Sequence, residues 1–266
     1  MSLVEPDPSA ELTDEELERY SRQIVLNELG GKGQLRLRNA RVAVVGAGGL
    51  GSPVLLYLAA AGVGHLTIVD DDAVNLDNLQ RQVLYEVDNL GSPKAVNAAD
   101  RLSSLNPEIT VRPVVARLVD ANAAAILGGH HAVVEGSDNL ATKFLVNDVC
   151  VRLGIGVVVG AVLRFEGQVV PVPPGAPCYR CLFGAEPPSD LVRSCRDVGV
   201  LGAVAGVVGS LQASETLRML TGIGDPQGGK LFALDALRPK LRTVSFRSDP
   251  SCTACAQRPA PAATPA

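Results

Sequence analysis

Short apolar runs alternate with helical patterns over the first 161 residues. The apolar runs are short and rich in β-branched residues, as buried strands are, and they cover 41–45, 65–69, 109–115, 132–135 and 156–161. Helical patterns separate them at 50–61, from 91–94 onward, at 122–127 and at 145–153. Strands that alternate with helices at this spacing predict a parallel, doubly wound sheet.

The pattern changes after residue 161. Residues 167–172, 230–234 and 242–246 resemble strands but lack the strand–helix–strand alternation. A glycine- and alanine-rich helix is expected at 199–221, suited to close packing or to a dimer interface. The whole pattern therefore predicts an α/β fold, a Rossmann-like, doubly wound, mostly parallel sheet with an antiparallel C-terminal extension.

A glycine-rich turn joins the first predicted strand to the next helix. The strand 41–45 leads directly into Gly46-x-Gly48-Gly49-x-Gly51. A helix that starts after such a turn points its free N–H groups at the turn and suits a nucleotide phosphate. Asp70 ends the second strand, about 20 positions beyond the glycines, where this motif has its ribose-binding acid. The alternative is a tight packing turn with no ligand.

Polar side chains crowd the loop that follows Asp70. Residues 70–82 carry groups that bind phosphate, ribose or metal. Lys94 lies in the first turn of the next predicted helix, where the helix dipole is already positive. We expect an anion between them, although an ordinary solvated lysine is the alternative.

A second acidic position, Asp138, follows the strand 132–135. Because Asp70 and Asp138 both lie at carboxyl ends of strands, the two carboxylates are expected to converge and to suit Mg²⁺ bound to a triphosphate. Asp138 could also cap the helix that follows.

Four of the six cysteines form two CxxC pairs. They are Cys178, Cys181, Cys252 and Cys255. In a cytosolic chain this spacing favours a structural, coordinatively closed Zn²⁺ site over a disulfide framework. Redox-active pairs or unrelated free thiols are the alternatives. Cys150 lies in an apolar helical stretch and is expected in the core.

Composition narrows the class of protein. The 266 residues have a formal net charge of −4 and no basic stripe, so we expect no nucleic-acid partner. The N-terminus lacks the regions of a signal peptide, and the longest apolar stretch is too short for a bilayer. We expect a cytoplasmic protein with no membrane partner.

The chain ends are expected to be disordered at 1–12 and 257–266, which leaves one domain over 13–256. Its nucleotide-binding half is about 41–161, and the rest is about 162–256. Thr13 and Glu16 form a capping box, which predicts a helix with Leu17, Tyr20 and Ile24 along one face.

Together these residues resemble the ThiF/MoeB/HesA family, the MoeB type most of all, over nearly the whole chain. The specific motifs are Arg19-Tyr-Ser-Arg22-Gln, the glycine loop, Asp77-Asn-Leu-Gln-Arg-Gln82, Gly91-Ser-Pro-Lys94, Ser137-Asp-Asn139, Phe165-Glu-Gly-Gln168, Gly209-Ser-Leu-Gln-Ala213 and the two CxxC pairs. The resemblance implies an adenylyltransferase that activates the C-terminal glycine of a ubiquitin-like sulfur-carrier protein (MoaD/ThiS-like) ending in Gly-Gly.

The resemblance also implies site residues. ATP would contact the glycine loop and Asp70, with Lys94 at the α-phosphate, and Asp138 would bind Mg²⁺. Arg22 would reach the partner's site in a homodimer. Asn78 and Arg81 would hold the phosphates. The cofactor-binding segment would also include Asp77, Leu79 and Gln80, and Asn139 would stand beside Asp138. Fixed cations suit this chemistry, because a carboxylate attacking a phosphate gathers negative charge.

Two points stay open within the resemblance. Cys195 matches a crossover-loop cysteine that in some members forms a covalent link to the carrier, and Arg193 and Arg196 could lower its pKa. Some relatives continue into a rhodanese-like domain, whereas this chain ends in a proline-alanine tail, so a separate sulfur donor is expected.

Three alternatives compete with this interpretation. An NAD-dependent oxidoreductase would use the glycine loop and Asp70 but leaves Arg81, Lys94 and the cysteine pairs unexplained. A related adenylating enzyme could act on tRNA or a peptide. A catalytically inactive dimeric scaffold could bind a ubiquitin-like fold. The molybdopterin, thiamin and related pathways cannot be distinguished from sequence.

Overall fold

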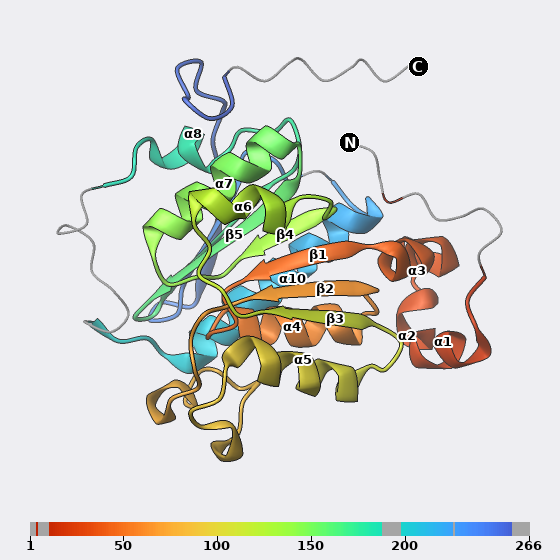
Figure 1. Cartoon of the computed structure of the whole chain (residues 1–266). Coiled ribbons are helices and arrows are strands. Elements are labelled where there is room, and N and C mark those ends of the chain that lie inside the picture. The colour runs from red at the N-terminus through yellow and green to blue at the C-terminus, as the bar shows by residue number, and fades with distance from the viewer. Residues whose placement is uncertain (1–3, 5–10, 188–197, 226, 257–266) are drawn as a thin grey trace, which may run out of the picture.

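A single eight-stranded sheet organises the chain (Figure 1). The computed structural model describes residues 4, 11–187, 198–225 and 227–256. The strand order is β3-β2-β1-β4-β5-β6-β7-β8. The strands are β1 (Arg41–Val45), β2 (His65–Val69), β3 (Thr110–Val114), β4 (Ala132–Glu135), β5 (Gly156–Leu163), β6 (Glu166–Val172), β7 (Lys230–Asp235) and β8 (Lys240–Ser245).

The sheet changes character at β5. Strands β3, β2, β1, β4 and β5 are parallel, and β6, β7 and β8 continue the sheet antiparallel. The predicted mixed architecture is therefore confirmed. β1 pairs with β2 on one side and with β4 on the other, so the chain order reverses at β1. Ligands in doubly wound folds bind at such a switch point, beyond the carboxyl ends of the strands.

Helices cover both faces of the sheet, because side chains on each strand alternate between two cores. Val42 and Val44 of β1 pack with one core, whereas Ala43 and Val45 pack with the other. The first core is covered by α3 (Gly30–Asn39), α4 (Gly51–Ala60), α5 (Lys94–Leu105) and α10 (Gly202–Thr221). The second is covered by α6 (Asp120–Leu127), α7 (Leu140–Leu153) and α8 (Tyr179–Phe183).

Helix α10 lies close to its neighbours, as its small residues predict. It contacts α4, β5 and β6. A Cβ at Gly209 would collide with the Pro53 ring and with the Leu50 carbonyl oxygen. The helix begins at Gly202 rather than at 199. Among the described residues, no helix is both long and apolar enough to cross a bilayer.

The N-terminal helix is shorter than predicted. The Thr13–Glu16 capping box is present, but the chain breaks at Tyr20 into α1 (Asp14–Arg19) and α2 (Ser21–Ile24). The predicted shared face is therefore wrong, since Leu17 is exposed and Tyr20 is buried. The buried Tyr20 hydroxyl accepts a hydrogen bond from Asn106 Nδ2 at 2.8 Å, a partner that the sequence does not reveal. The predicted disordered tails fall almost wholly outside the described residues.

Candidate nucleotide site

The glycine loop has a backbone that other residues could not adopt. Gly46 has φ +88°, and a Cβ there would lie 2.9 Å from the Ser137 nitrogen. A Cβ at Gly51 would collide with the Gly46 carbonyl oxygen. Glycine is thus required both to turn the chain after β1 and to start α4 against the turn. The loop also contacts the segment that follows β4.

Asp70 lies where the motif predicts, directly after β2. Its Oδ2 accepts a hydrogen bond from the Ala47 nitrogen at 2.7 Å, and its Oδ1 accepts one from the Asp72 nitrogen at 2.9 Å. Burial raises the pKa of Asp70, although these two bonds and Lys94 oppose the shift. A carboxylate has about four lone-pair sites. Asp70 therefore holds the glycine loop and keeps acceptor capacity for a ligand hydroxyl.

The polar segment after Asp70 lies against the glycine loop and the start of α10. A Cβ at Gly49 would lie 3.3 Å from Arg81 Cγ and 3.5 Å from the Ala205 side chain. Arg81 donates to the Asp77 carbonyl oxygen at 2.9 Å, and buried Asn78 donates to Asp77 Oδ1 at 2.8 Å. Leu79 packs against the core, while Gln80 is exposed beside Gly202.

Gln82 is a site residue that the sequence prediction missed. Its side chain is buried and its Oε1 has no hydrogen-bond partner among the described residues. Its Nε2 lies 3.5 Å from where a Gly48 Cβ would be. A buried polar atom without a partner is costly, and here it belongs to a side chain that contacts the glycine turn at Gly48. This arrangement fits a polar ligand such as a nucleotide. The sequence feature that could have identified Gln82 is its position at the end of the 77–82 motif.

Lys94 is the first residue of α5 and is almost fully buried. Its Nζ lies 2.9 Å from Asp72 Oδ2. In this structure the partner of the Lys94 ammonium is the Asp72 carboxylate, and the anion expected between Lys94 and the helix N-terminus stays a prediction. Asp72 is half exposed, so a phosphate of a ligand could replace it. The run Asp70-Asp71-Asp72 carried the signal for this partner but did not indicate which acid pairs with Lys94.

The segment after β4 holds the second carboxylate. Asp138 is exposed and makes no ion pair or side-chain hydrogen bond with the described part of the chain. The alternative that Asp138 caps α7 is wrong, because Asn139 is the N-cap and accepts from the Thr142 nitrogen at 2.9 Å. Topology places Asp70 and Asp138 beyond β2 and β4, on either side of β1. Asp138 is free for a cation, whereas Asn139 Oδ1 is already engaged.

The four cysteines of the CxxC pairs come together. All four sulfurs lie within 4.8 Å of one another. The Sγ–Sγ distances are 3.6 Å for Cys178–Cys252 and 3.3 Å for Cys181–Cys255. A tetrahedral Zn²⁺ with bonds of about 2.3 Å needs sulfurs roughly 3.8 Å apart. The cluster therefore fits a metal ion.

Cys150 is separate from this cluster and is buried in the core as predicted, and burial raises its pKa to about 12.

Comparison with known proteins identifies the family to which the chain belongs. The model of the ThiF family matches residues 20–254. The chain belongs to the ThiF family. It is 48% identical to a sulfur carrier protein adenylyltransferase of Thermus thermophilus, with 93% of each chain covered. It is 46% identical to a SAMP-activating enzyme E1 of Haloferax volcanii, covering 91% of this chain and 90% of that protein.

Solved structures share the fold of this chain. A crystal structure of E. coli MccB with MccA-N7isoASN superposes with a TM-score of 0.80 at 23% identity, over 90% of this chain and 74% of that one. A crystal structure of E. coli MccB with ATP gives a TM-score of 0.78 at 23% identity, over 93% and 76%. At this identity the likeness concerns the fold alone.

Of the other predicted site residues, Arg22 lies away from the nucleotide site of its own chain, as expected of a residue that would reach a partner's site. Arg22 is exposed on α2, and its neighbour Gln23 donates to the Ala61 carbonyl oxygen at 2.9 Å, at the C-terminal end of α4. The glycine loop lies at the other end of α4. Figure 1 shows α1 and α2 at the far end of β1–β3 from the loop that precedes α5. Cys195, with Arg193 and Arg196, lies outside the described residues.

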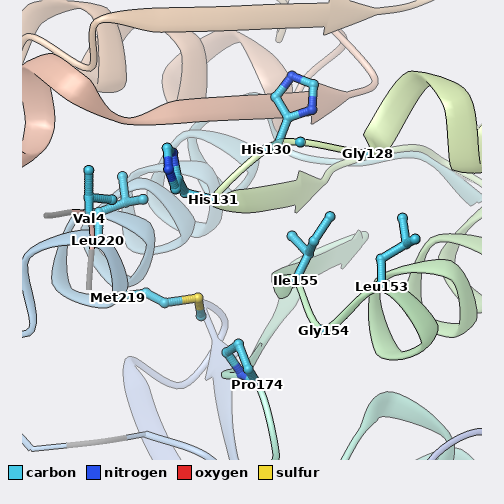
Figure 2. A pocket seen from close by; sticks show the side chains of 11 residues that line it. Val4, Gly128, His130, His131, Leu153, Gly154, Ile155, Pro174, Met219 and Leu220 are labelled. Atoms are coloured by element: carbon cyan, nitrogen blue, oxygen red, sulfur yellow. The ribbon is translucent and has the colours of Figure 1, made fainter. Parts of the chain in front are cut away.

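A pocket of about 350 Å³ lies at the amino ends of β4 and β5, whereas the glycine loop follows the carboxyl end of β1 (Figure 2). Its two histidines are used structurally: His130 Nε2 lies 2.9 Å from Thr67 Oγ1, and His131 Nδ1 accepts from the Arg41 nitrogen at 2.9 Å. Burial lowers the pKa of both imidazoles. Leu153, Ile155 and Leu220 form much of the remaining lining. This pocket contains none of the predicted site residues.

Proposed function

We propose that the protein is a nucleotidyltransferase that adenylylates the C-terminal glycine of a ubiquitin-like sulfur-carrier protein. The reaction is carrier–COO⁻ + ATP → carrier–CO–AMP + PPi, and the acyl-adenylate is then ready for a sulfur nucleophile. The supporting observation is the buried Lys94 at the start of α5, on the same sheet edge as the glycine loop. Two relatives of matching length, one named as a sulfur carrier protein adenylyltransferase and one as a SAMP-activating enzyme, support the same activity.

The chain supplies charge rather than a general base. The attacking carboxylate is already ionised, so the obstacle is repulsion between anions. Lys94 would stabilise the α-phosphate after exchanging Asp72 for it, and Arg81 would hold the other phosphates. Asp70 would accept from the ribose. Asp138 would bind Mg²⁺, which supplies charge neutralisation on the phosphates when it is bound.

A homodimer with shared sites completes the proposal. Arg22 lies near the amino ends of the parallel strands. The 10 residues of α4, at about 1.5 Å each, separate it from its own glycine loop by about 15 Å. Arg22 would therefore serve the site of a second copy more readily than its own. Val25 and Leu26 beside it are more than half exposed, and a second copy could cover them.

The remaining roles are assigned as follows. The cysteine cluster would hold Zn²⁺ as a structural ion, because four thiolates leave no open position. A domain over 13–256 would act in the cytoplasm, and the carrier acyl-adenylate would receive sulfur from a sulfurtransferase or desulfurase. The carrier would serve molybdopterin, thiamin or a related thio-cofactor route. Cys195 would not be needed for adenylylation and would act only after it.

Other activities explain less of the site. Hydride transfer by an oxidoreductase would not require the Lys94–Asp72 pair. Measurable nicotinamide reduction would support an oxidoreductase. Adenylylation of tRNA or of a peptide uses the same nucleotide edge. The formal charge of −4 opposes tRNA. An inactive scaffold would bind ATP without turnover.

Pyrophosphate exchange tests the proposal. ATP–pyrophosphate exchange is measured with Mg²⁺, with and without small ubiquitin-like proteins that end in Gly-Gly. We expect exchange with one carrier only, abolished by Asp138→Ala and by Arg22→Ala and retained by Cys195→Ala. Asp88→Ala, an exposed acid on the 3₁₀ helix Val87–Asn89, is the matched control and is expected to be fully active. Bound ATP without exchange for any carrier would refute the proposal.

A further inference from the structure

A fully buried ion pair lies where β4 ends, next to the predicted magnesium ligand. Lys143 and Glu135 are both almost completely inaccessible. Lys143 Nζ lies 2.6 Å from Glu135 Oε2, 2.7 Å from the Ser137 carbonyl oxygen and 2.7 Å from the Gly160 carbonyl oxygen. All three ammonium protons therefore have an acceptor.

The pair fixes one residue of the loop from three sides. Glu135 Oε1 accepts from both the nitrogen and the hydroxyl of Ser137, while Lys143 donates to the carbonyl oxygen of the same residue. Ser137 immediately precedes Asp138 and contacts the glycine loop, since a Gly46 Cβ would lie 2.9 Å from its nitrogen. Every polar atom of Ser137, in the backbone and in the side chain, is therefore held by this pair.

The backbone of Glu135 is held as well. Gln212 of α10 donates from Nε2 to the carbonyl oxygens of Glu135 and Val158, at 2.8 Å and 3.1 Å. The end of β4 is thus clamped by α7 from one face and by α10 from the other.

Energetics indicate that this pair serves more than stability. Desolvating two charges costs several kcal/mol per ion, and apolar replacement of a buried pair is often neutral or stabilising. Burial also raises the pKa of Glu135 against the influence of Lys143. Local rules are broken mainly at functional sites. A charged pair at the nucleotide edge, bonded to the residue before Asp138, fits that pattern.

We propose that Lys143 and Glu135 are positioning residues that hold Ser137 so that the Asp138 carboxylate faces the nucleotide edge. They act through Asp138 and touch neither nucleotide nor carrier. The inference rests on the proposed function for its link to magnesium, but the loop restraint itself does not.

A double variant tests the inference without leaving an unpaired charge. Glu135→Leu/Lys143→Met replaces both members by apolar residues and should fold. ATP affinity is measured calorimetrically with Mg²⁺ and again with EDTA, and the ratio of the two is the readout. We expect the double change to reduce this ratio about tenfold with little change in the EDTA value, because only cation binding depends on Asp138.

A mutant cycle separates positioning from structure. In an Asp138→Asn background, the double change should lower the ratio no further, since both act on one interaction. A merely structural role would lower ATP affinity in both conditions and add to Asp138→Asn, which would overturn the inference. Glu215→Leu/Arg218→Met removes another ion pair, on α10, and is expected to leave the ratio unchanged.

Hydrogen exchange tests the loop independently of ATP. The Ser137 amide should exchange at least tenfold faster in the Glu135→Leu/Lys143→Met protein, because its acceptor is gone. An unchanged rate overturns the inference whether or not the protein binds ATP. If the unsubstituted chain itself binds no ATP, a faster rate in the double variant still supports the restraint, and the proposed function is refuted instead.

Discussion

Two lysine–carboxylate pairs lie at the same edge of the sheet but in different surroundings. Lys94 binds Asp72 at 2.9 Å, and Lys143 binds Glu135 at 2.6 Å. Both lysines are buried, whereas the Asp72 side chain is 56% exposed and that of Glu135 is 0% exposed. An exposed carboxylate can be exchanged for a ligand phosphate at little cost, because water solvates it when it leaves. A buried carboxylate has no such alternative and stays.

The accessibility of the acid therefore decides what the same ion pair can do. The Lys94 pair can open and present a cation to an incoming anion. The Lys143 pair can only hold its surroundings in place. The following experiments test this distinction, from the largest expected effect to the smallest.

Removing the buried acid should cost the most stability. Glu135→Gln leaves the Lys143 ammonium buried without a carboxylate, which costs about 3–5 kcal/mol for a broken buried pair. Urea denaturation measures the loss. The comparison fails if Asp72→Asn destabilises the protein as much as Glu135→Gln does.

Removing Lys94, whose carboxylate partner can be exchanged, should affect turnover rather than stability. Lys94→Met deletes a fixed cation that faces the developing charge, and pyrophosphate exchange should fall by about 10²–10³-fold. The melting temperature should change far less than in Glu135→Gln. An active Lys94→Met enzyme would show that the Asp72 pair is only structural.

Metal removal tests whether the buried pair depends on the cysteine cluster. The two are joined by α7, where Asp148 binds Arg180 of the first CxxC pair at 2.7 Å and Asn147 accepts from the Tyr179 nitrogen at 2.9 Å. These contacts lie about one helical turn beyond Lys143, but Lys143 Nζ keeps its own acceptors on Glu135, Ser137 and Gly160. A chelator should therefore lower the melting temperature but leave ATP binding in EDTA-washed protein near normal. A matching loss of ATP binding would mean that the whole helix depends on the metal.

The smallest effect is expected from the exposed acid. Asp72→Asn removes a half-exposed partner, and such pairs contribute about 0–1 kcal/mol. ATP affinity should rise by a few fold, because Lys94 no longer has a carboxylate to exchange. Calorimetry measures the affinity, and a decrease would show that Asp72 itself contacts the ligand.

Patterns along the sequence predict the sheet and its nucleotide edge but not the partners within it. The strand 132–135 was identified from its apolar run, yet its last residue is the buried Glu135, whose partner is on the next helix. Nothing local in sequence pairs these two. Asp138 and Asn139 are both good N-cap residues, and only the backbone at the start of α7 decides that Asn139 is the cap.

Side-chain chemistry was more predictable where spacing itself carries the geometry. The cysteine pairs and the glycine loop could be identified because each ligand or turn position is specified within a few residues. Tyr20 is the opposite case. Its burial depends on Asn106, far along the chain, and so the predicted continuous helix face was wrong.

The position of α10 in the chain affects how the protein emerges from the ribosome. The strands β1–β5 are complete by residue 163, but one of the two cores is closed by Val204, Val208 and other residues of α10. At roughly 5–20 residues per second, the nascent parallel half waits several seconds before that helix is synthesised. During this interval α3, α4 and α5 can pack on that face of the sheet, but the apolar side chains that α10 covers in the folded chain stay exposed to solvent.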